Sequence, residues 1–246
     1  MMTNMLASFA EKLPDRYYLP VRSAYHVMTN SFDKEIVRAG ALLKRHRRFL
    51  DVGANTGIYS YYFMRRMQYV EAFEPLAEVT KKLAALSSSS VNIHNLALSD
   101  INSILEFHIP VDAGGALRTT RASIEPRDGP SVVRKVEVKQ LDEFGFEDVD
   151  MIKIDVEGHE TQVIRGAAET IRKCRPIMVV EIEQRHVSQP VSEIFREIES
   201  YGYSGFFFDK GTLKNVDAFD VDAHQTCFLD DVYQRGYVNN FIFVAR

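Results

Sequence analysis

Short apolar runs alternate with amphipathic stretches through most of this chain. The apolar runs predict strands at 48–51, 69–73, 91–97, 151–155 and 177–182. Apolar residues at helical spacing between these runs predict helices at 58–67, 76–86, 160–172 and 191–201. Strands that alternate with helices of roughly 10 to 15 residues are typical of parallel βαβ units covered on both faces. The pattern therefore predicts an α/β protein with a doubly wound, mostly parallel sheet.

Two segments interrupt this alternation. Apolar and polar residues alternate singly at 104–109 and at 132–139, which predicts an inserted antiparallel β-hairpin. Residues 112–131 between them are rich in Gly, Pro, Ser and Arg, and a loop of that length is usually functional or disordered. Its arginines, Arg118, Arg121 and Arg127, could bind a phosphate, sulfate or carboxylate, although a solvated loop is the commoner explanation for them.

The two ends of the chain complete the predicted architecture. Residues 1–40 form a helical pattern, which we expect to be an N-terminal extension packed on a core of residues 41–246. Apolar runs at 205–208 and 241–244 suit two last strands. A chain of 246 residues with this continuous pattern predicts a single domain.

Composition limits the cellular compartments and the classes of binding partner that we expect. The net charge of −4 gives no electrostatic drive toward nucleic acid, so we expect no nucleic-acid partner. Cys174 and Cys227 lie far apart without a CxxC spacing, which indicates a reducing compartment. We find no apolar stretch of membrane-spanning length, and therefore expect a cytoplasmic protein.

The segment 51–57, Asp-Val-Gly-Ala-Asn-Thr-Gly, follows a predicted strand and opens a predicted helix. Open α/β sheets bind ligands at this place, and Gly53 and Gly57 allow a ligand to approach bare backbone. Glu74 ends the next strand about 20 residues further on, where an acid can accept hydrogen bonds from the ribose hydroxyls of a nucleoside.

The same loop distinguishes between nucleoside cofactors. A dinucleotide loop carries G-x-G-x-x-G, but Asn55 and Ile58 occupy the second and third glycine positions here. Asp51 would also repel a pyrophosphate, whereas it suits a cationic ligand. The loop therefore favours S-adenosylmethionine, with an NAD(P)-dependent oxidoreductase as the alternative.

Four segments together resemble FkbM-type methyltransferases: 49–57, 73–75, 96–100 and 153–160. The resemblance extends from about residue 33 to residue 183. It implies a Rossmann-like methyltransferase fold with a seven-stranded sheet whose last strand is antiparallel. It also implies O-methylation of a hydroxyl on a saccharide, glycolipid or related secondary metabolite, so the expected partner is a small-molecule or glycan acceptor.

The resemblance also implies cofactor contacts. Those with the methionine part would come from Asp51, Gly53, Asn55 and Gly57. Glu74 would bind the ribose. The adenine would lie against Ala97, Leu98, Ser99 and Asp100.

The fourth predicted strand carries the candidate chemistry. Asp155 ends it, and Glu157 and His159 follow within the next four residues. An alcohol is a poor nucleophile until it loses its proton, so a base within hydrogen-bond reach should help. We predict that Asp155 orients the cofactor or the acceptor and that His159 or Glu157 receives the proton. An exposed position at the start of a helix is the alternative for His159.

Several alternatives remain open from the sequence. Asp155 with Glu181 or Glu183 could hold a divalent cation, but no Asp-Asn pair follows the fifth strand, so we expect no metal. N-methylation of protein or RNA, or a non-catalytic module that keeps the fold, would also suit the pattern. Neither the acceptor nor the oligomeric state follows from the sequence.

Overall fold

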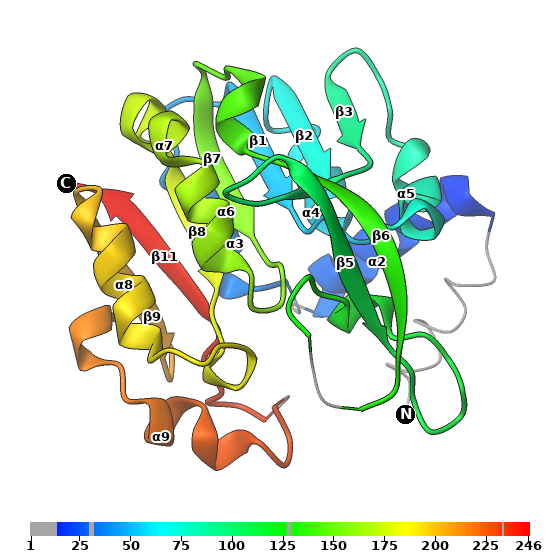
Figure 1. Cartoon of the computed structure of the whole chain (residues 1–246). Helices are drawn as coiled ribbons and strands as arrows, with labels where there is room; N and C mark the ends of the chain where they lie inside the picture. Colours follow the sequence, from blue (N-terminus) through cyan, green and yellow to red (C-terminus); the bar gives the residue numbers. More distant parts are fainter. Residues whose placement is uncertain (1–13, 30–31, 127–128, 233) are drawn as a thin grey trace.

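The computed structural model describes residues 14–29, 32–126, 129–232 and 234–246, and Figure 1 shows their arrangement. Arg127 therefore lies outside the described residues. In the described residues the main sheet has eight strands in the order β10-β9-β11-β8-β7-β1-β2-β3. They are β1 (Arg48–Val52), β2 (Tyr69–Phe73), β3 (Val91–His94), β7 (Val149–Ile154), β8 (Ile177–Glu181), β9 (Tyr203–Asp209), β10 (Thr212–Asn215) and β11 (Asn240–Ala245).

The strand directions agree with a doubly wound fold. Strands β3, β2, β1, β7 and β8 are mutually parallel, and β11 runs antiparallel to both β8 and β9. The number of strands differs from the seven that the resemblance implied, because β9 turns back into β10 at the edge of the sheet. Lys210 and Gly211 both have positive φ at this turn, which a tight hairpin requires.

Helices cover both faces of the sheet (Figure 1). The longer helices are α2 (Asp15–Thr29), α3 (Lys34–Ala41), α4 (Ile58–Phe63), α5 (Ala77–Ala84), α6 (Glu160–Gly166), α7 (Ala168–Cys174) and α8 (Val191–Ser200). Shorter turns are η1 (Thr119–Arg121), η2 (Leu141–Phe144), η3 (Gln184–His186), η4 (Val216–Ala218), α9 (Val221–His224) and η5 (Thr226–Phe228).

Successive residues of the central strands are buried on opposite faces. Leu50 and Ile152 pack in the core with α6, α7 and α8, whereas Phe49 and Met151 pack in the core with α2, α3, α4 and α5. A parallel strand buried on both faces is apolar at every position, which explains the continuous apolar runs of the sequence. In the described part of the predicted N-terminal extension, α3 packs on β8 and β11, and α2 packs on α4 and α5. Residues 1–13 of that prediction lie outside the described residues.

The third predicted strand, 91–97, is divided between two sheets. Residues Val91–His94 pair with β2, and the chain then leaves the main sheet, so that β4 (Ala97–Leu98) pairs with β6 (Ser131–Lys139). β5 (Ser103–Pro110) pairs antiparallel with β6, which gives a smaller sheet in the order β4-β6-β5. The predicted hairpin strands thus form part of a three-stranded sheet, and a long connection joins them.

The helix predicted at 160–172 is also divided, into α6 and α7 at Gly166 and Ala167. A Cβ on Gly166 would lie 1.9 Å from the carbonyl oxygen of Ser99. The end of α6 therefore packs directly on the backbone that follows β4. The helix predicted at 58–67 is likewise shorter, since α4 ends at Phe63.

No helix among the described residues is long and apolar enough to cross a membrane.

Replacing Gly166 with Ala tests the close packing of α6. An alanine normally stabilises a helix interior by about 1 kcal/mol relative to glycine. Here the methyl group would overlap the Ser99 carbonyl, so we expect Gly166→Ala to lower the free energy of unfolding by about 1–3 kcal/mol. Gly114→Ala, where the added Cβ would lie 3.4 Å from Asp112 Oδ1, should change it by less than about 0.5 kcal/mol. Urea denaturation followed by circular dichroism measures both, and an unchanged Gly166→Ala protein would contradict the packing.

Candidate active site

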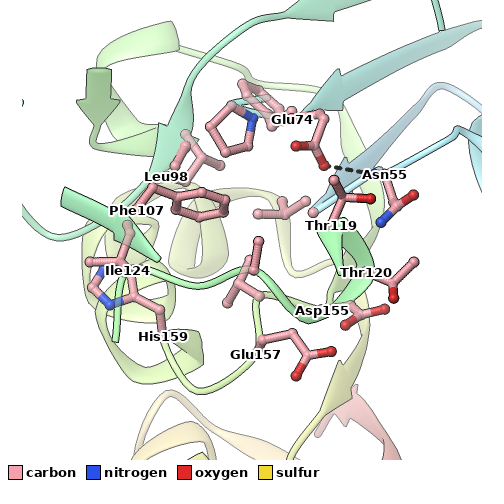
Figure 2. A pocket seen from close by; sticks show the side chains of 17 residues that line it. Asn55, Glu74, Leu98, Phe107, Thr119, Thr120, Ile124, Asp155, Glu157 and His159 are labelled. Atoms are coloured by element: carbon pink, nitrogen blue, oxygen red, sulfur yellow. Dashed lines mark hydrogen bonds between the residues drawn. The ribbon is translucent and has the colours of Figure 1, made fainter. Parts of the chain in front are cut away.

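Two cavities adjoin at the carboxyl ends of β1, β2 and β7. The first, which we call the apolar cavity, is shown in Figure 2. It is lined by Val52, Gly53, Asn55, Phe73, Glu74, Pro75, Ala97, Leu98, Phe107, Thr119, Thr120, Ala122, Ile124, Asp155, Val156, Glu157 and His159. The second, which we call the polar cavity, has a volume of about 530 Å³. The two share Gly53, Asn55, Thr120, Asp155 and Glu157.

The glycine loop after β1 lies directly against the end of β7. Gly53 has φ +76°, and a Cβ there would lie 1.8 Å from the carbonyl oxygen of Asp155. The backbone N–H groups of Gly53 and Ala54 both donate to the carbonyl of Phe73, each at 3.0 Å. Only glycine fits this position, because it combines positive φ with contact between two backbones.

Asn55 and Glu74 are held together by a hydrogen bond from the backbone of Asn55. Asn55 has φ +46°, and its N–H donates to Glu74 Oε2 at 3.0 Å. The N–H of Leu76 donates to Glu74 Oε1 at 2.9 Å. Burial raises the pKa of the Glu74 carboxyl to about 7, although these two hydrogen bonds oppose the rise. Figure 2 shows this carboxyl group at the edge of the apolar cavity.

Most of the predicted site residues line the apolar cavity. They are Gly53, Asn55, Glu74, Ala97, Leu98, Asp155, Glu157 and His159. The structure thus brings together the glycine loop, the acid after β2, strand β4 and the segment after β7. Sequence analysis did not identify Phe107 and Ile124, which complete the apolar wall from the insertion (Figure 2).

The other predicted residues lie behind the cavity wall. Asp51 is fully buried, and its Oδ2 accepts hydrogen bonds from Ser60 N at 2.9 Å and Ser60 Oγ at 2.6 Å. Gly57 precedes α4 and packs against Leu83. The Ser99 hydroxyl faces Asp100 at 3.2 Å, and neither residue lines either cavity. These residues therefore support the walls without reaching the space inside.

His159 occupies a different environment from the exposed helix start considered above. It is 4% exposed, and both ring nitrogens have partners: Nδ1 lies 2.7 Å from Glu125 Oε1, and Nε2 lies 2.9 Å from Ser99 Oγ. It lines the apolar cavity but not the polar one. With both nitrogens engaged, His159 is poorly placed to take a proton from an acceptor.

Lys153 lies beside Asp155 and was missed by sequence analysis. Its side chain is 2% exposed, and Nζ lies 2.7 Å from Asp155 Oδ2 and 4.8 Å from the centre of the Tyr59 ring. Burial alone lowers the pKa of this ammonium, but the carboxylates of Asp155, Asp51 and Glu181 raise it above its usual value. The signal available in the sequence was a lysine within an otherwise apolar strand, since buried charges are rare without a partner.

Hydrogen-bonding side chains from the C-terminal half of the chain form much of the polar cavity. Asn239 Nδ2 donates to Glu181 Oε1 at 2.6 Å, and Arg185 and Tyr237 both donate to Glu183. Burial alone would raise the pKa of Glu183, but these two donors lower it to about 2. Burial and the neighbouring Asp155 raise the pKa of Glu181 well above its usual value. The pKa values of these two neighbouring carboxyl groups are therefore shifted in opposite directions.

A metal centre would require Asp155 and Glu181 or Glu183 to converge with a further ligand. Among the residues that the structure describes, no group of three or more His, Cys, Asp or Glu side chains is arranged to hold a metal ion. The Lys153 ammonium instead contacts Asp155.

Glu160 gives a prediction for the dependence of stability on pH. It is 2% exposed, its Oε1 accepts from Gly158 N at 2.9 Å, and burial raises its pKa from 4.5 to about 7. Because the folded state binds this proton more tightly, the group destabilises the fold increasingly as pH rises from about 4.5 to about 7. Glu160→Gln should therefore raise the free energy of unfolding by about 2–3 kcal/mol at pH 8 and by under about 1 kcal/mol at pH 5.

Urea denaturation at the two pH values measures this difference. Glu106→Gln, on the exposed surface of β5, provides the matched control and should give little gain at either pH. An equal gain for Glu160→Gln at pH 5 and pH 8 would contradict the assignment.

Comparisons with known proteins agree with this geometry. Residues 51–204 match the family described as the Methyltransferase FkbM domain, which is more than half of the chain. The chain is 29% identical over 149 residues to the 2-O-methyltransferase NoeI of Sinorhizobium fredii, covering 51% of this chain and 59% of that relative. The chain thus spans somewhat more than half the length of the curated relative.

A solved structure shows the same fold. The methyltransferase FkbM from Methylobacillus flagellatus superposes with a TM-score of 0.54 at 15% identity, covering 98% of this chain and 58% of that chain. The fold is therefore a Rossmann-like methyltransferase fold, as the sequence implied. The family match also favours methyl transfer over the NAD(P)-dependent alternative. This chain belongs to the FkbM methyltransferase domain family.

Proposed function

We propose that this protein is an S-adenosylmethionine-dependent O-methyltransferase whose acceptor is a hydroxyl group of a saccharide or related metabolite. The observation that carries the proposal is the junction of the two cavities at Asp155. At Asp155 the apolar cavity, which has the Glu74 carboxyl group at its edge, adjoins a polar cavity rich in hydrogen-bonding groups.

The apolar cavity suits the adenosine part of the cofactor. Leu98, Phe107 and Ile124 provide apolar surface for a purine ring. The Glu74 carboxylate can accept hydrogen bonds from both ribose hydroxyls, since each oxygen keeps a lone pair beyond its bond to a backbone N–H. Gly53 and Asn55 lie where the cavities join, so the methionine part would lie against bare backbone at that point.

The polar cavity suits a polyhydroxylated acceptor. Arg185, Gln234, Tyr237 and Asn239 offer donors and acceptors in one space, and Tyr59 adds an aromatic ring. Sugars present many hydroxyl groups, and they can exchange hydrogen bonds with the donors and lone pairs that remain on these side chains beyond their bonds to Glu181 and Glu183. The relative named a 2-O-methyltransferase supports transfer to a hydroxyl oxygen.

Asp155 is the best-placed base for the acceptor. It borders both cavities, and Lys153 contacts its Oδ2, which leaves Oδ1 to accept the proton of a bound hydroxyl. The Lys153 ammonium also holds this carboxylate in place through a buried ion pair. Glu157, with Oε2 3.3 Å from His186 Nδ1, is the second candidate. His159 is not proposed as the base, because both of its ring nitrogens are engaged.

The cofactor supplies a methyl group activated by the positive sulfonium. The chain would contribute alignment and proton removal: residues of the two cavities would hold the cofactor and the acceptor next to each other, and Asp155 would take the hydroxyl proton. Positioning of this kind supplies much of the rate enhancement of a bimolecular reaction.

Binding of S-adenosylhomocysteine tests the cofactor assignment. The ionised Glu74 carboxylate accepts from the ribose, and the free protein carries this group with a pKa of about 7. Affinity should therefore rise about five- to tenfold from pH 6 to pH 8. Glu74→Gln should weaken binding at pH 8 by at least about tenfold and abolish this pH dependence. Isothermal titration calorimetry measures both, and an unchanged affinity would refute the ribose assignment.

Methyl transfer from labelled S-adenosylmethionine tests the acceptor class. We expect label to appear in members of a panel of mono- and oligosaccharides. Asp155→Asn should lower turnover by at least about 100-fold, because it removes the base. The same variant should change the affinity for S-adenosylhomocysteine by less than about threefold. Glu157→Gln, the alternative base, should retain more activity than Asp155→Asn. Label found only in peptide or RNA would replace the proposal with N-methylation.

A further inference from the structure

The insertion between β5 and β6 supplies one wall of the apolar cavity. We call residues 119–125, which include η1, the wall segment. Thr119, Thr120, Ala122 and Ile124 of this segment line the apolar cavity, beside Phe107 of β5 (Figure 2). The opposing contacts come from the main sheet, so the cavity lies between two separate parts of the fold.

Backbone hydrogen bonds fix the middle of the wall segment. Ser123 N donates to the His108 carbonyl at 3.1 Å, and His108 N donates to the Ser123 carbonyl at 2.8 Å. The Ser123 hydroxyl donates to the carbonyl of Glu157 at 2.8 Å. Ser123 therefore joins the wall segment both to β5 and to the segment that carries the candidate base.

Three hydrogen-bonded side chains hold the C-terminal end of the wall segment. Glu125 Oε1 lies 2.7 Å from His159 Nδ1, and His159 Nε2 lies 2.9 Å from Ser99 Oγ. A carboxylate only accepts hydrogen bonds, so His159 donates to it through Nδ1. Ser99 in turn is fixed by its N–H, which donates to the Lys139 carbonyl at 2.9 Å. We call this chain, Ser99–His159–Glu125, the clasp.

The exposure of the clasp differs from one end to the other. Ser99 is 1% exposed and His159 is 4% exposed, but the Glu125 side chain is 35% exposed. Water can therefore compete for the carboxylate, while the histidine stays fixed in the core. The end of the wall segment can therefore separate from His159 at the Glu125–His159 hydrogen bond.

We propose that Glu125 and His159 are positioning residues, which hold the wall segment against the adenosine part of the cofactor and slow its release. The proposal rests on the proposed function, because it takes the apolar cavity to be the adenosine site. It gives the insertion and His159 a role that neither the base assignment nor the sequence motifs provide. A ligand in the cavity leaves when the Glu125–His159 bond breaks and the end of the wall segment beyond Ser123, with Ile124, moves away from His159.

Glu125→Ala tests the clasp without an acceptor. The probes are S-adenosylhomocysteine and 5′-methylthioadenosine, which share the adenosine part but differ in the amino acid. We expect the dissociation rate of both to rise about tenfold and their affinity to fall about five- to tenfold, because the clasp acts at the end they share. Glu125→Gln keeps Oε1 as an acceptor and should restore part of the loss. Glu106→Ala, on the exposed surface of the neighbouring strand β5, is the matched control and should leave the dissociation rates of both probes unchanged.

Stopped-flow displacement and calorimetry measure these quantities, and the free energy of unfolding shows whether each variant is folded. His159→Asn is the second variant and should also accelerate release of both probes. Unchanged dissociation rates in folded Glu125→Ala would overturn the clasp. A change for S-adenosylhomocysteine alone would also overturn it, because the effect would then lie at the methionine end. If the wild-type protein binds neither probe, the proposed function itself fails.

Discussion

The contact between Gly53 and the Asp155 carbonyl is the constraint on which the site depends. Strands β1 and β7 are adjacent and parallel, so the loops that follow them must diverge or share the space beyond the sheet. Here they share it, with no room for a Cβ between them. As a result, the backbone of the glycine loop, the Glu74 carboxyl bound to Asn55 N and the Asp155 carboxylate all face one space. A side chain at position 53 would separate the cofactor loop from the residue proposed to take the proton.

A second constraint is the charge buried beneath that contact. Lys153 lies among the carboxyl groups of Asp51, Asp155 and Glu181, and an isolated charge at such a depth would be strongly unfavourable. Apolar residues of similar volume would often give comparable stability, so stability alone does not explain the arrangement. The ion pair with Lys153 does hold the Asp155 carboxylate in place where the two cavities meet. Clustered groups with shifted pKa values are typical of functional sites, and here they border the polar cavity.

The sequence predicted features that depend on local pattern. The parallel strands, the loop after β1 and the position of Glu74 follow from apolar runs and from one motif at a strand end. The division of 91–97 between two sheets and the break at Gly166 were not predictable, because both depend on contacts between segments far apart in the chain: Ala97 pairs with Val138, and Gly166 packs on the Ser99 backbone. The environment of His159 was missed for the same reason. Its partners, Ser99 and Glu125, lie 60 and 34 residues away in the chain, and no local pattern shows such bonds.

The two cavities differ in how much of their lining lies within the family match, and this difference bears on acceptor specificity. The residues lining the apolar cavity all lie within 51–204, the part that matches the family. The polar cavity also draws on Asp33 before this region, and on Val232, Gln234, Tyr237 and Asn239 after it. Because Asn239 contacts Glu181 and Tyr237 contacts Glu183, the C-terminal segment determines how these two acids face the cavity. The proposed cofactor side therefore lies within the family match, and the proposed acceptor side also uses segments outside it. Acceptor choice can then change through the end of the chain while the arrangement around Gly53 and Asp155 stays the same.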